Sequence, residues 1–238
     1  MRLDRYLSNS GLGSRSEVKV LIKKKLVKVN GEIVKSPSLI IDEINDVVTL
    51  NDEVIKYSKF VYVLINKPKG YVSAVEDNVY PPVTDLVQQY EYAKLFPVGR
   101  LDVDTTGTLL LTNDGELCHR LLSPKYHVDK TYSVTVNGVI SISLINKFKE
   151  GIMLDGELTL PADLVILDDT HAELTIHQGK FHQVKRMFKN FDLNVIELDR
   201  KYFSFLNHLD IKLGDYRELS NDEVDKLYKI VGLEINQR

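Results

Sequence analysis

The sequence predicts an α+β protein with two domains: a small domain of two helices and a β-hairpin at residues 1–58, and a larger domain with a mixed, largely antiparallel sheet at residues 59–238. Two observations predict this class. Segments of strand length and of helical length follow one another without the regular alternation that builds a parallel βαβ sheet. The chain also contains no internal repeat and no low-complexity segment, which argues against repeat architectures.

Length and composition are typical of a soluble globular protein. The chain has 238 residues, 43% of them hydrophobic, and a formal net charge of -3, which is enough for a sizeable core. Cys118 is the only cysteine, so no internal disulfide can form, as is usual in a reducing compartment. The N-terminus lacks the apolar segment of a signal peptide, and no apolar run approaches the ~20 residues that span a bilayer. We therefore expect a cytoplasmic protein with no membrane association.

Positive charge is concentrated at the N-terminus. Residues 1–35 contain nine Lys or Arg and three Asp or Glu, a net charge of +6, so the other 203 residues carry -9. A compact basic module on an acidic body is typical of a tethered nucleic-acid-binding domain. A run such as Lys23-Lys24-Lys25 is by itself more often a solvated surface, so the elements that carry the cluster decide its meaning.

These elements are predicted in order from local signals. A first helix runs from about Leu3 to Asn9 and stops before Gly11. Ser14-Arg15-Ser16-Glu17 has the pattern of a capping box and opens a second helix that continues to about Lys25. Asn30-Gly31 lies between alternating apolar residues, which predicts a two-residue hairpin turn.

Basic side chains are predicted to avoid the apolar face of the second helix. Val18, Leu21 and Ile22 share that face, and the basic residues fall away from it. Two helices and a hairpin with a basic face resemble the S4 RNA-binding domain. The resemblance implies RNA contacts from six residues: Arg2, Arg5, Arg15, Lys19, Lys23 and Lys24.

The chain changes character after Ser58, where we predict the domain boundary. Residues 60–66 form a continuous apolar run of strand length, and Lys67-Pro68-Lys69-Gly70 ends it. The remaining predicted elements are strands at 109–112, 130–136 and 173–176, and helices at 116–122, 142–148 and 181–191.

The most informative segment is Gly99-Arg100-Leu101-Asp102-Val103-Asp104-Thr105-Thr106-Gly107, which places an arginine and two carboxylates in a glycine-bounded loop just before a strand. The residues alone leave three alternatives open. The loop could be a turn whose side chains bond their own backbone, a magnesium site, or the carboxylate pair of a retaining glycosidase. Neither the magnesium site nor the glycosidase accounts for the basic N-terminal segment.

This loop resembles the catalytic motif of the pseudouridine synthases, in the form carried by the RsuA family of bacterial ribosomal-RNA enzymes. The resemblance extends over nearly the whole chain. It implies that Asp102 is the catalytic aspartate, that Tyr132 stacks on the target uracil, and that Lys185 pairs with Asp102. It further implies that three residues contact the substrate RNA: Arg100, Lys130 and Arg186.

These implied roles are chemically reasonable. A base taken out of a helix needs an aromatic face, which contributes roughly 1–3 kcal/mol, although Tyr132 on a strand could equally be a core residue. An ammonium within ~4–6 Å of Asp102 would keep the carboxylate ionised. Lys185 stands where many relatives have Arg, so a point charge replaces a bidentate fork. Arg186 is expected to meet a phosphate, and Arg100 to fill the stack that a flipped nucleotide vacates.

The resemblance implies isomerisation of uridine to pseudouridine in 16S rRNA, at position 516 in standard rRNA numbering, by a monomer acting on a partly assembled small subunit. No cofactor and no metal are expected, since the six histidines form no ligand pattern. One alternative is a large-subunit 23S rRNA enzyme, and another is a non-catalytic S4-type rRNA-binding assembly factor. Thr108 and Tyr202-Phe203-Ser204 depart from the family pattern, so we expect local differences in packing there.

Overall fold

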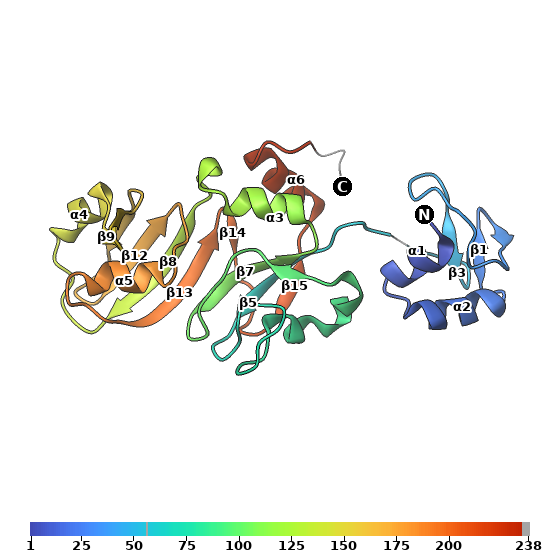
Figure 1. Cartoon of the computed structure of the whole chain (residues 1–238), viewed down its shortest axis with the longest axis horizontal. Helices are drawn as coiled ribbons and strands as arrows, with labels where there is room; N and C mark the ends of the chain where they lie inside the picture. Colours follow the sequence, from blue (N-terminus) through green and yellow to red (C-terminus); the bar gives the residue numbers. More distant parts are fainter. Residues whose placement is uncertain (56, 235–238) are drawn as a thin grey trace. The chain divides into compact units, whose positions relative to one another are not determined.

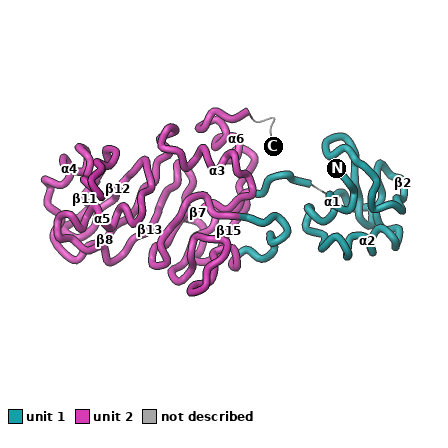
Figure 2. Tube along the Cα trace, in the orientation of Figure 1, with its two compact units in different colours: residues 1–61, 87–95, 238 teal, residues 62–86, 96–237 magenta. Residues whose placement is uncertain are grey.

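The computed structural model describes residues 1–55 and 57–234, so the last four residues of the predicted second domain lie outside the described part. The chain divides into two compact units, which Figure 2 colours separately: residues 1–61 with 87–95, and, among the described residues, 62–86 with 96–234. The sequence prediction divides the chain once, near Ser58, and keeps residues 87–95 in the second domain.

Unit 1 consists of two helices and a small sheet. The helices are α1 (Leu3–Asn9) and α2 (Arg15–Lys23), and the four-stranded sheet has the order β2-β1-β3-β4, with β1 (Val27–Val29), β2 (Glu32–Ile33), β3 (Val48–Leu50) and β4 (Glu53–Val54). The capping box is present, because Ser14 Oγ accepts from Glu17 N–H while the Glu17 carboxylate accepts from Ser14 N–H. Asn30 and Gly31 have the positive φ angles of the predicted hairpin turn, 52° and 83°. The predicted helices and hairpin are confirmed.

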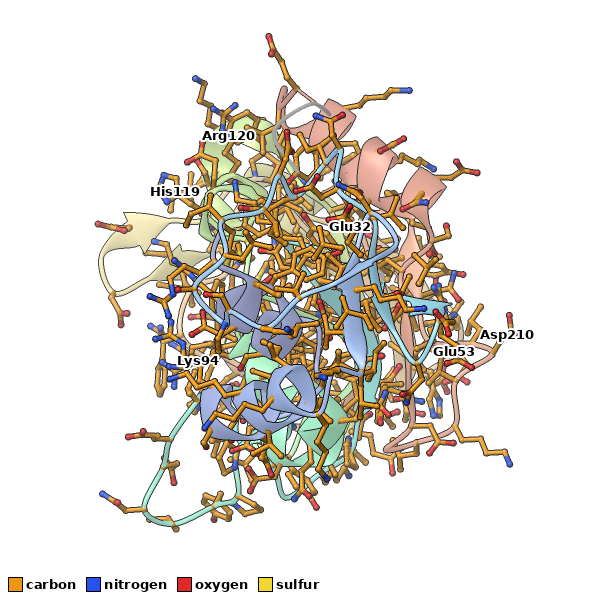
Figure 3. All side chains as sticks on the ribbon, turned by 90° about the vertical axis from the view of Figure 1, so that its right-hand side faces the viewer. Glu32, Glu53, Lys94, His119, Arg120 and Asp210 are labelled. Carbon is orange, nitrogen blue, oxygen red and sulfur yellow. The ribbon has the colours of Figure 1, made fainter. Side chains whose placement is uncertain are left out.

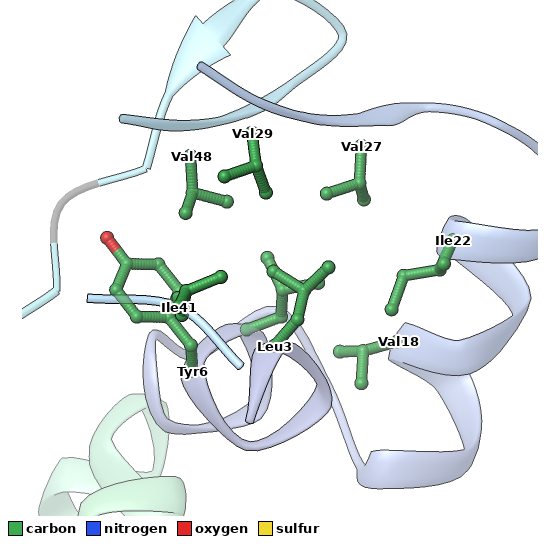
Figure 4. Close-up of a cluster of buried hydrophobic side chains, with 9 residues drawn as sticks. Leu3, Tyr6, Val18, Ile22, Val27, Val29, Ile41 and Val48 are labelled. Carbon is green, nitrogen blue, oxygen red and sulfur yellow. The ribbon is translucent and has the colours of Figure 1, made fainter. Parts of the chain in front are cut away.

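The core of unit 1 is formed by apolar side chains from both helices and the sheet (Figure 4). Its buried members are Leu3, Tyr6, Leu7, Val18, Ile22, Val27, Val29, Ile41 and Val48. Full burial of one such side chain contributes about 1.5–3 kcal/mol, so this cluster fixes which helix faces point inward. The six basic residues predicted to contact RNA are all exposed.

Unit 2 is built on one large mixed sheet (Figure 1). The strand order is β11-β12-β8-β13-β7-β5-β15, with β14 paired to β13 and β6 paired to β7. Neighbouring strands are antiparallel except β13 and β7, which are parallel. The strands are β5 (Tyr62–Lys67), β6 (Phe96–Pro97), β7 (Thr106–Thr112), β8 (Lys130–Val136), β11 (Asp163–Ile166), β12 (His171–Ile176), β13 (Val195–Phe203), β14 (Leu206–Asn207) and β15 (Tyr216–Glu218). The predicted α+β class with a largely antiparallel sheet is confirmed.

Helices and a separate hairpin complete unit 2. The α-helices are α3 (Gly115–Leu122), α4 (Leu144–Glu150), α5 (Gln183–Lys189) and α6 (Asn221–Ile230), and the hairpin is β9 (Met153–Leu154) with β10 (Glu157–Leu158). The 3₁₀ segments are Val83–Ala93, which is kinked at Val87, and Pro124–Tyr126. Helix α5 starts later than predicted because His182 has a left-handed backbone conformation, φ 46° and ψ 36°. Among the described residues, no helix has both the length and the apolar character needed to cross a bilayer.

A buried polar cluster attaches the C-terminal helix to the sheet. The hydroxyls of Tyr62 and Tyr228 donate to the same oxygen of Asp114, at 2.8 and 2.5 Å, while the other Asp114 oxygen accepts from Leu117 N–H and caps α3. Burial, together with the nearby carboxylate, raises the pKa of both tyrosines. Arg120 of α3, labelled in Figure 3, extends the attachment by donating to the backbone carbonyls that follow α6.

Gly107 allows the two parallel strands at the centre of the sheet to meet. Its φ is +110°, and a Cβ atom there would lie 2.5 Å from the carbonyl oxygen and 2.7 Å from the nitrogen of Arg200 on β13. No side chain fits so close to backbone atoms. Glycine at this position therefore lets β7 start against β13, which places the preceding loop, residues 99–105, at the middle of the sheet.

Candidate active site

Lys67, the last residue of β5, supports the loop that carries Asp102 by hydrogen bonds to the loop backbone. The Lys67 side chain is fully buried, and its ammonium donates to the carbonyls of Asp102 (3.0 Å), Thr105 (2.9 Å) and Pro68 (3.1 Å). Burial lowers the pKa of Lys67 to about 8, against the opposing effect of the nearby Asp102 and Asp104 charges. Three carbonyl acceptors match the three donors of an ammonium, so the charged form fits this position.

Residues that follow Lys67 in the sequence make further hydrogen bonds to the backbone of the same loop. The buried Ser73 hydroxyl accepts from Leu101 N–H at 2.9 Å and donates to the Leu101 carbonyl at 3.0 Å. Gly70 N–H donates to the Val103 carbonyl at 2.8 Å. The backbone on each side of Asp102 is therefore fixed by a segment that lies about thirty residues earlier in the sequence.

The carboxylates of this loop share one ammonium. Lys185 Nζ lies 3.0 Å from Asp102 Oδ2 and 2.5 Å from Asp104 Oδ1, so the structure contains the pairing that the resemblance implies. The side chain of Asp102 is 26% exposed and that of Asp104 69%. Burial alone would lower the pKa of Lys185, but the hydrogen bonds that its ammonium donates to Asp104 and Asp102 raise it. For Asp104 the signs are reversed: burial alone would raise the pKa of this carboxyl, but the hydrogen bond and charge of Lys185 hold that pKa below its usual value.

His182 is a neighbour of Asp102 that sequence reasoning did not assign. Its Nε2 atom lies 3.5 Å from Asp102 Oδ1, whereas Lys185 contacts the other carboxylate oxygen, Oδ2. The left-handed backbone of His182 turns its ring toward the loop at the start of α5. The sequence carried a signal for this position, since Gly179-Lys180-Phe181-His182 precedes the helix that bears Lys185.

Tyr132 lies in the middle of β8 and is 7% exposed. Its register partners are Leu174 on β12 and Arg200 on β13. Arg200 is fully buried, and its Nε–H donates to the Thr108 carbonyl at 2.8 Å, while one guanidinium nitrogen, Nη2, has no partner among the described residues. Tyr132 is therefore held on a sheet face that also contains buried positive charge.

Lys130, which the resemblance implies to contact the substrate RNA, is buried in this structure. Lys130 is only 5% exposed, and its ammonium donates to the Val128 carbonyl at 2.9 Å. Burial, with the repulsion of Arg200, lowers the pKa of Lys130 to about 8. A phosphate contact needs an accessible ammonium, which this side chain does not provide. The motif Lys130-Thr131-Tyr132 alternates across the strand, so Lys130 and Tyr132 share the buried face.

The positions that depart from the family pattern pack around the same buried cations. Phe203 is fully buried and lies beneath both of them, with its ring centroid 5.2 Å from Arg200 Cζ and 5.6 Å from Lys130 Nζ. The Thr108 hydroxyl donates to the Lys201 carbonyl at 2.7 Å. Both departures are thus accommodated inside the sheet.

The other predicted RNA contacts lie in different surroundings. Arg100 is exposed at the start of the loop. Arg186 points to the β9–β10 hairpin, where its guanidinium pairs with Asp155 at 2.5 Å. In unit 1, Arg2 is bonded through Nε and Nη2 to the buried Asp4, at 3.0 and 2.8 Å. The structure brings together Asp102 and Lys185, and it places Tyr132 on β8 of the same large sheet from which the Asp102 loop leads into β7.

The geometry also bears on the alternatives left open by the sequence. The described residues contain no group of three or more side chains that could hold a metal ion. Asp102 and Asp104 face one shared ammonium, so they do not flank a substrate bond from two sides as the carboxylates of a glycosidase do. The loop thus presents one half-buried carboxylate, that of Asp102, paired with the ammonium of Lys185.

Comparisons with known proteins agree with this arrangement. The RNA pseudouridylate synthase family model matches residues 61–190, and the S4 domain model matches residues 1–48. The chain is 43% identical to the uncharacterized RNA pseudouridine synthase YtzG of Bacillus subtilis, over 95% of this chain and 98% of the relative. It is 42% identical to the ribosomal small subunit pseudouridine synthase A of Haemophilus influenzae, over 96% and 100% of the two chains.

Two further matches extend the comparison. The ribosomal large subunit pseudouridine synthase B of Bacillus subtilis is 38% identical, over 95% of each chain. A solved structure described as a crystal structure of pseudouridylate synthase is 39% identical, with a TM-score of 0.67, over 95% of this chain and 99% of that one. Relatives named for both ribosomal subunits are therefore similar along the whole length of the chain.

Proposed function

This chain belongs to the RNA pseudouridylate synthase family and is a pseudouridine synthase with an S4 domain; from that premise we propose that it converts one uridine of 16S ribosomal RNA, at position 516 in standard numbering, to pseudouridine. The observation that carries the site assignment is the ammonium of Lys185 lying 3.0 Å from the half-buried carboxylate of Asp102. The proposed substrate is the RNA of a partly assembled small subunit in the cytoplasm, and the enzyme acts as a monomer.

The proposed role of Asp102 follows from the bonds that must change. The C1′–N1 glycosidic bond breaks, the uracil rotates, and a C1′–C5 bond forms. The proton on C5 then leaves, and N1 gains one, so the product is an isomer of the substrate. Asp102 starts this sequence either by attacking the sugar or base, or by abstracting a proton that promotes glycosidic cleavage. Both routes use the carboxylate of Asp102, which the ammonium of Lys185 contacts at 3.0 Å.

Tyr132 and Arg100 are proposed to handle the displaced base. Tyr132 lies on the sheet face next to the buried Arg200, where an aromatic ring can hold the uracil while it rotates. Stacking of this kind contributes roughly 1–3 kcal/mol per base. Arg100 is exposed at the start of the Asp102 loop and is proposed to occupy the stack that the flipped nucleotide leaves. Arg186 would exchange Asp155 for a phosphate when RNA binds.

Unit 1 is proposed to dock the enzyme on the RNA. Its predicted contacts are exposed on two helices whose other faces form the core, so their charges are available to phosphates. This arrangement separates binding from chemistry, because Asp102 and Lys185 belong to unit 2.

The small-subunit assignment is supported by Lys130-Thr131-Tyr132 together with the short segment from His182 to Met187, and by relatives named for that subunit. The similarity to a large-subunit enzyme keeps 23S rRNA as the second candidate.

Pseudouridine mapping in rRNA from cells with and without this protein decides between the two. Loss of the modification at position 516 of 16S rRNA, restored by the wild-type chain and not by Asp102→Asn, supports the proposal. Loss at a 23S uridine transfers the activity to the large subunit, and unchanged rRNA in the deletion strain would falsify both assignments.

A further inference from the structure

An apolar ring lies in solvent next to the candidate active site. Phe181 is 73% exposed, although it immediately precedes His182, whose side chain contacts Asp102. Burying a phenylalanine side chain would contribute about 1.5–3 kcal/mol to folding, and this protein does not gain that energy from Phe181. An exposed phenylalanine alone is unremarkable, so its surroundings must indicate what it does.

Two contacts hold Phe181, one on its ring and one on its backbone. The ring stacks on that of His182, with centroids 3.8 Å apart and planes 20° from parallel. The Phe181 carbonyl accepts a hydrogen bond from the Arg186 guanidinium at 3.2 Å. The stack continues to the carboxylate, because His182 Nε2 lies 3.5 Å from Asp102 Oδ1. Phe181, His182 and Asp102 thus form a continuous row from solvent to the candidate catalytic oxygen.

Positive charge flanks this row. In the sequence, Lys180 precedes Phe181 and His182, and Arg186 follows them. Each is paired with an exposed carboxylate of the β9–β10 hairpin: Lys180 with Glu157 at 2.6 Å, and Arg186 with Asp155 at 2.5 Å. Exposed ion pairs of this kind contribute only about 0–1 kcal/mol. A phosphate can therefore replace either carboxylate at little cost, so the segment that carries the ring also carries two cations that can bind phosphate.

We propose that Phe181 is a stacking platform for an unpaired nucleobase of the substrate RNA, adjacent to the uridine that enters the active site. The inference rests on the proposed function and extends it to a second nucleotide. The flanking cations favour an RNA base over an apolar protein surface as the occupant. Because every base has a π-face, the platform tolerates any sequence. Through His182, an occupied platform also restrains the side chain beside Asp102.

Fluorescence of 2-aminopurine tests the stacking directly. The probe is a single-stranded oligoribonucleotide containing one 2-aminopurine, mixed with the full-length protein at saturation. Stacking on Phe181 quenches the probe, and Phe181→Tyr should preserve the quench. Phe181→Ala and Phe181→Leu should lose it, because leucine keeps apolar area without a π-face. Ile142→Ala, which truncates another exposed apolar side chain of unit 2, should behave as wild type.

Turnover on rRNA from cells that lack the protein gives the second measurement. Phe181→Ala should lower kcat/KM about 5- to 150-fold, the equivalent of ~1–3 kcal/mol of stacking, while kcat at saturating RNA stays within a few-fold of wild type. Phe181→Tyr should restore kcat/KM.

The outcomes separate this inference from the proposed function. If the wild-type chain modifies no rRNA, the proposed substrate is wrong. The 2-aminopurine quench then decides by itself whether a base stacks on Phe181. If Phe181→Ala keeps both the quench and kcat/KM, or if Phe181→Leu matches Phe181→Tyr in both, Phe181 is not a stacking platform.

Discussion

The two units of this protein use the same kinds of basic side chain in opposite ways. In unit 1, Arg15, Lys19 and Lys23 are exposed on a helix whose apolar face is buried. In unit 2, Lys67, Lys130 and Arg200 are almost completely buried and bond to backbone carbonyls. Exposed charge acts at a distance and is screened by salt, whereas buried charge acts on its immediate neighbours.

This difference separates two tasks within one chain. Exposed lysines of unit 1 can change partners freely, which suits docking on a phosphate backbone. The buried ammonium of Lys67 has three acceptors at fixed distances, which suits holding a loop in one conformation. We therefore expect substitutions of the buried cations of unit 2 to change turnover at saturating RNA, and substitutions of the exposed cations of unit 1 to change binding alone.

The largest expected effect on turnover is that of Asp102→Asn. The substitution keeps the shape of the side chain and removes the negative charge, so turnover should fall more than about 1,000-fold. RNA binding, measured by filter retention or anisotropy, should stay near wild type. Asp104→Asn is the matched control, because Asp104 contacts the same ammonium but is largely exposed, and it should cost less than about tenfold. Equal losses from the two substitutions would contradict the assignment of Asp102.

Lys67→Met should have the next largest effect. It removes the donor to the Asp102 and Thr105 carbonyls while keeping an apolar side chain of similar length, so the loop loses its support. Buried carbonyls left without a donor cost about 1–3 kcal/mol each, and a small misplacement of a catalytic group can cost about 100-fold in rate. Thermal unfolding and kcat should both decline. A normal kcat in a destabilised Lys67→Met protein would show that the loop keeps its geometry without the lysine.

A moderate effect is expected from pH. The pKa of Lys67 and of Lys130 is lowered to about 8, while the same groups in the unfolded chain titrate near 10.4. Between these values the unfolded chain binds more protons, so the stability contributed by the two groups rises with pH, and below pH 8 their buried charge opposes folding in full. Turnover should nevertheless fall about tenfold by pH 9, because neutral Lys67 has one donor fewer for its carbonyls. A rate profile that is flat from pH 7 to 9 would contradict this role.

Neutralising the exposed basic residues of unit 1 should leave turnover at saturating RNA near wild type. Replacing Arg15, Lys19 and Lys23 by Gln should weaken rRNA binding and lower the slope of log Kd against log salt by roughly 0.7–0.9 for each lost phosphate contact. Arg2 is left in place, because its removal would leave the buried Asp4 unpaired. A control with Lys149, Lys212 and Lys229 of unit 2 replaced should keep the wild-type slope. The same slope in both triple variants would mean that unit 1 is not the docking module.

Local signals predicted those parts of the fold that depend on nearby residues. The capping box of Ser14 and Glu17 and the Asn30-Gly31 turn were readable because each is a contact between close neighbours in the sequence. Strand β13 was not predicted, since its charged residues hide its strand pattern and its place is set by pairing with β8 and β7. Helix α5 was predicted too long because nothing local announces the left-handed His182.

The candidate site shows the same limit. Asp102 and Lys185 stand in recognisable motifs, and the resemblance paired them across the sequence. Lys130 looked like an RNA contact, because a lysine in a motif carries no mark of burial; only the register of β8 with β13 turns it inward. The role of Lys67 under the loop was equally invisible, since its three acceptors come together only when β5 lies beside β7.

The sequence by itself therefore determined the fold class, through local periodicity, and the basic N-terminal segment, through its charge. It also determined the residue types at the candidate site, through motifs that resemble a known family. The tertiary structure alone decided which cations face solvent and which support the loop, and it brought His182 to the carboxylate of Asp102. The physical reason is that burial and hydrogen-bond partners depend on strand pairing between distant segments, which no local pattern records.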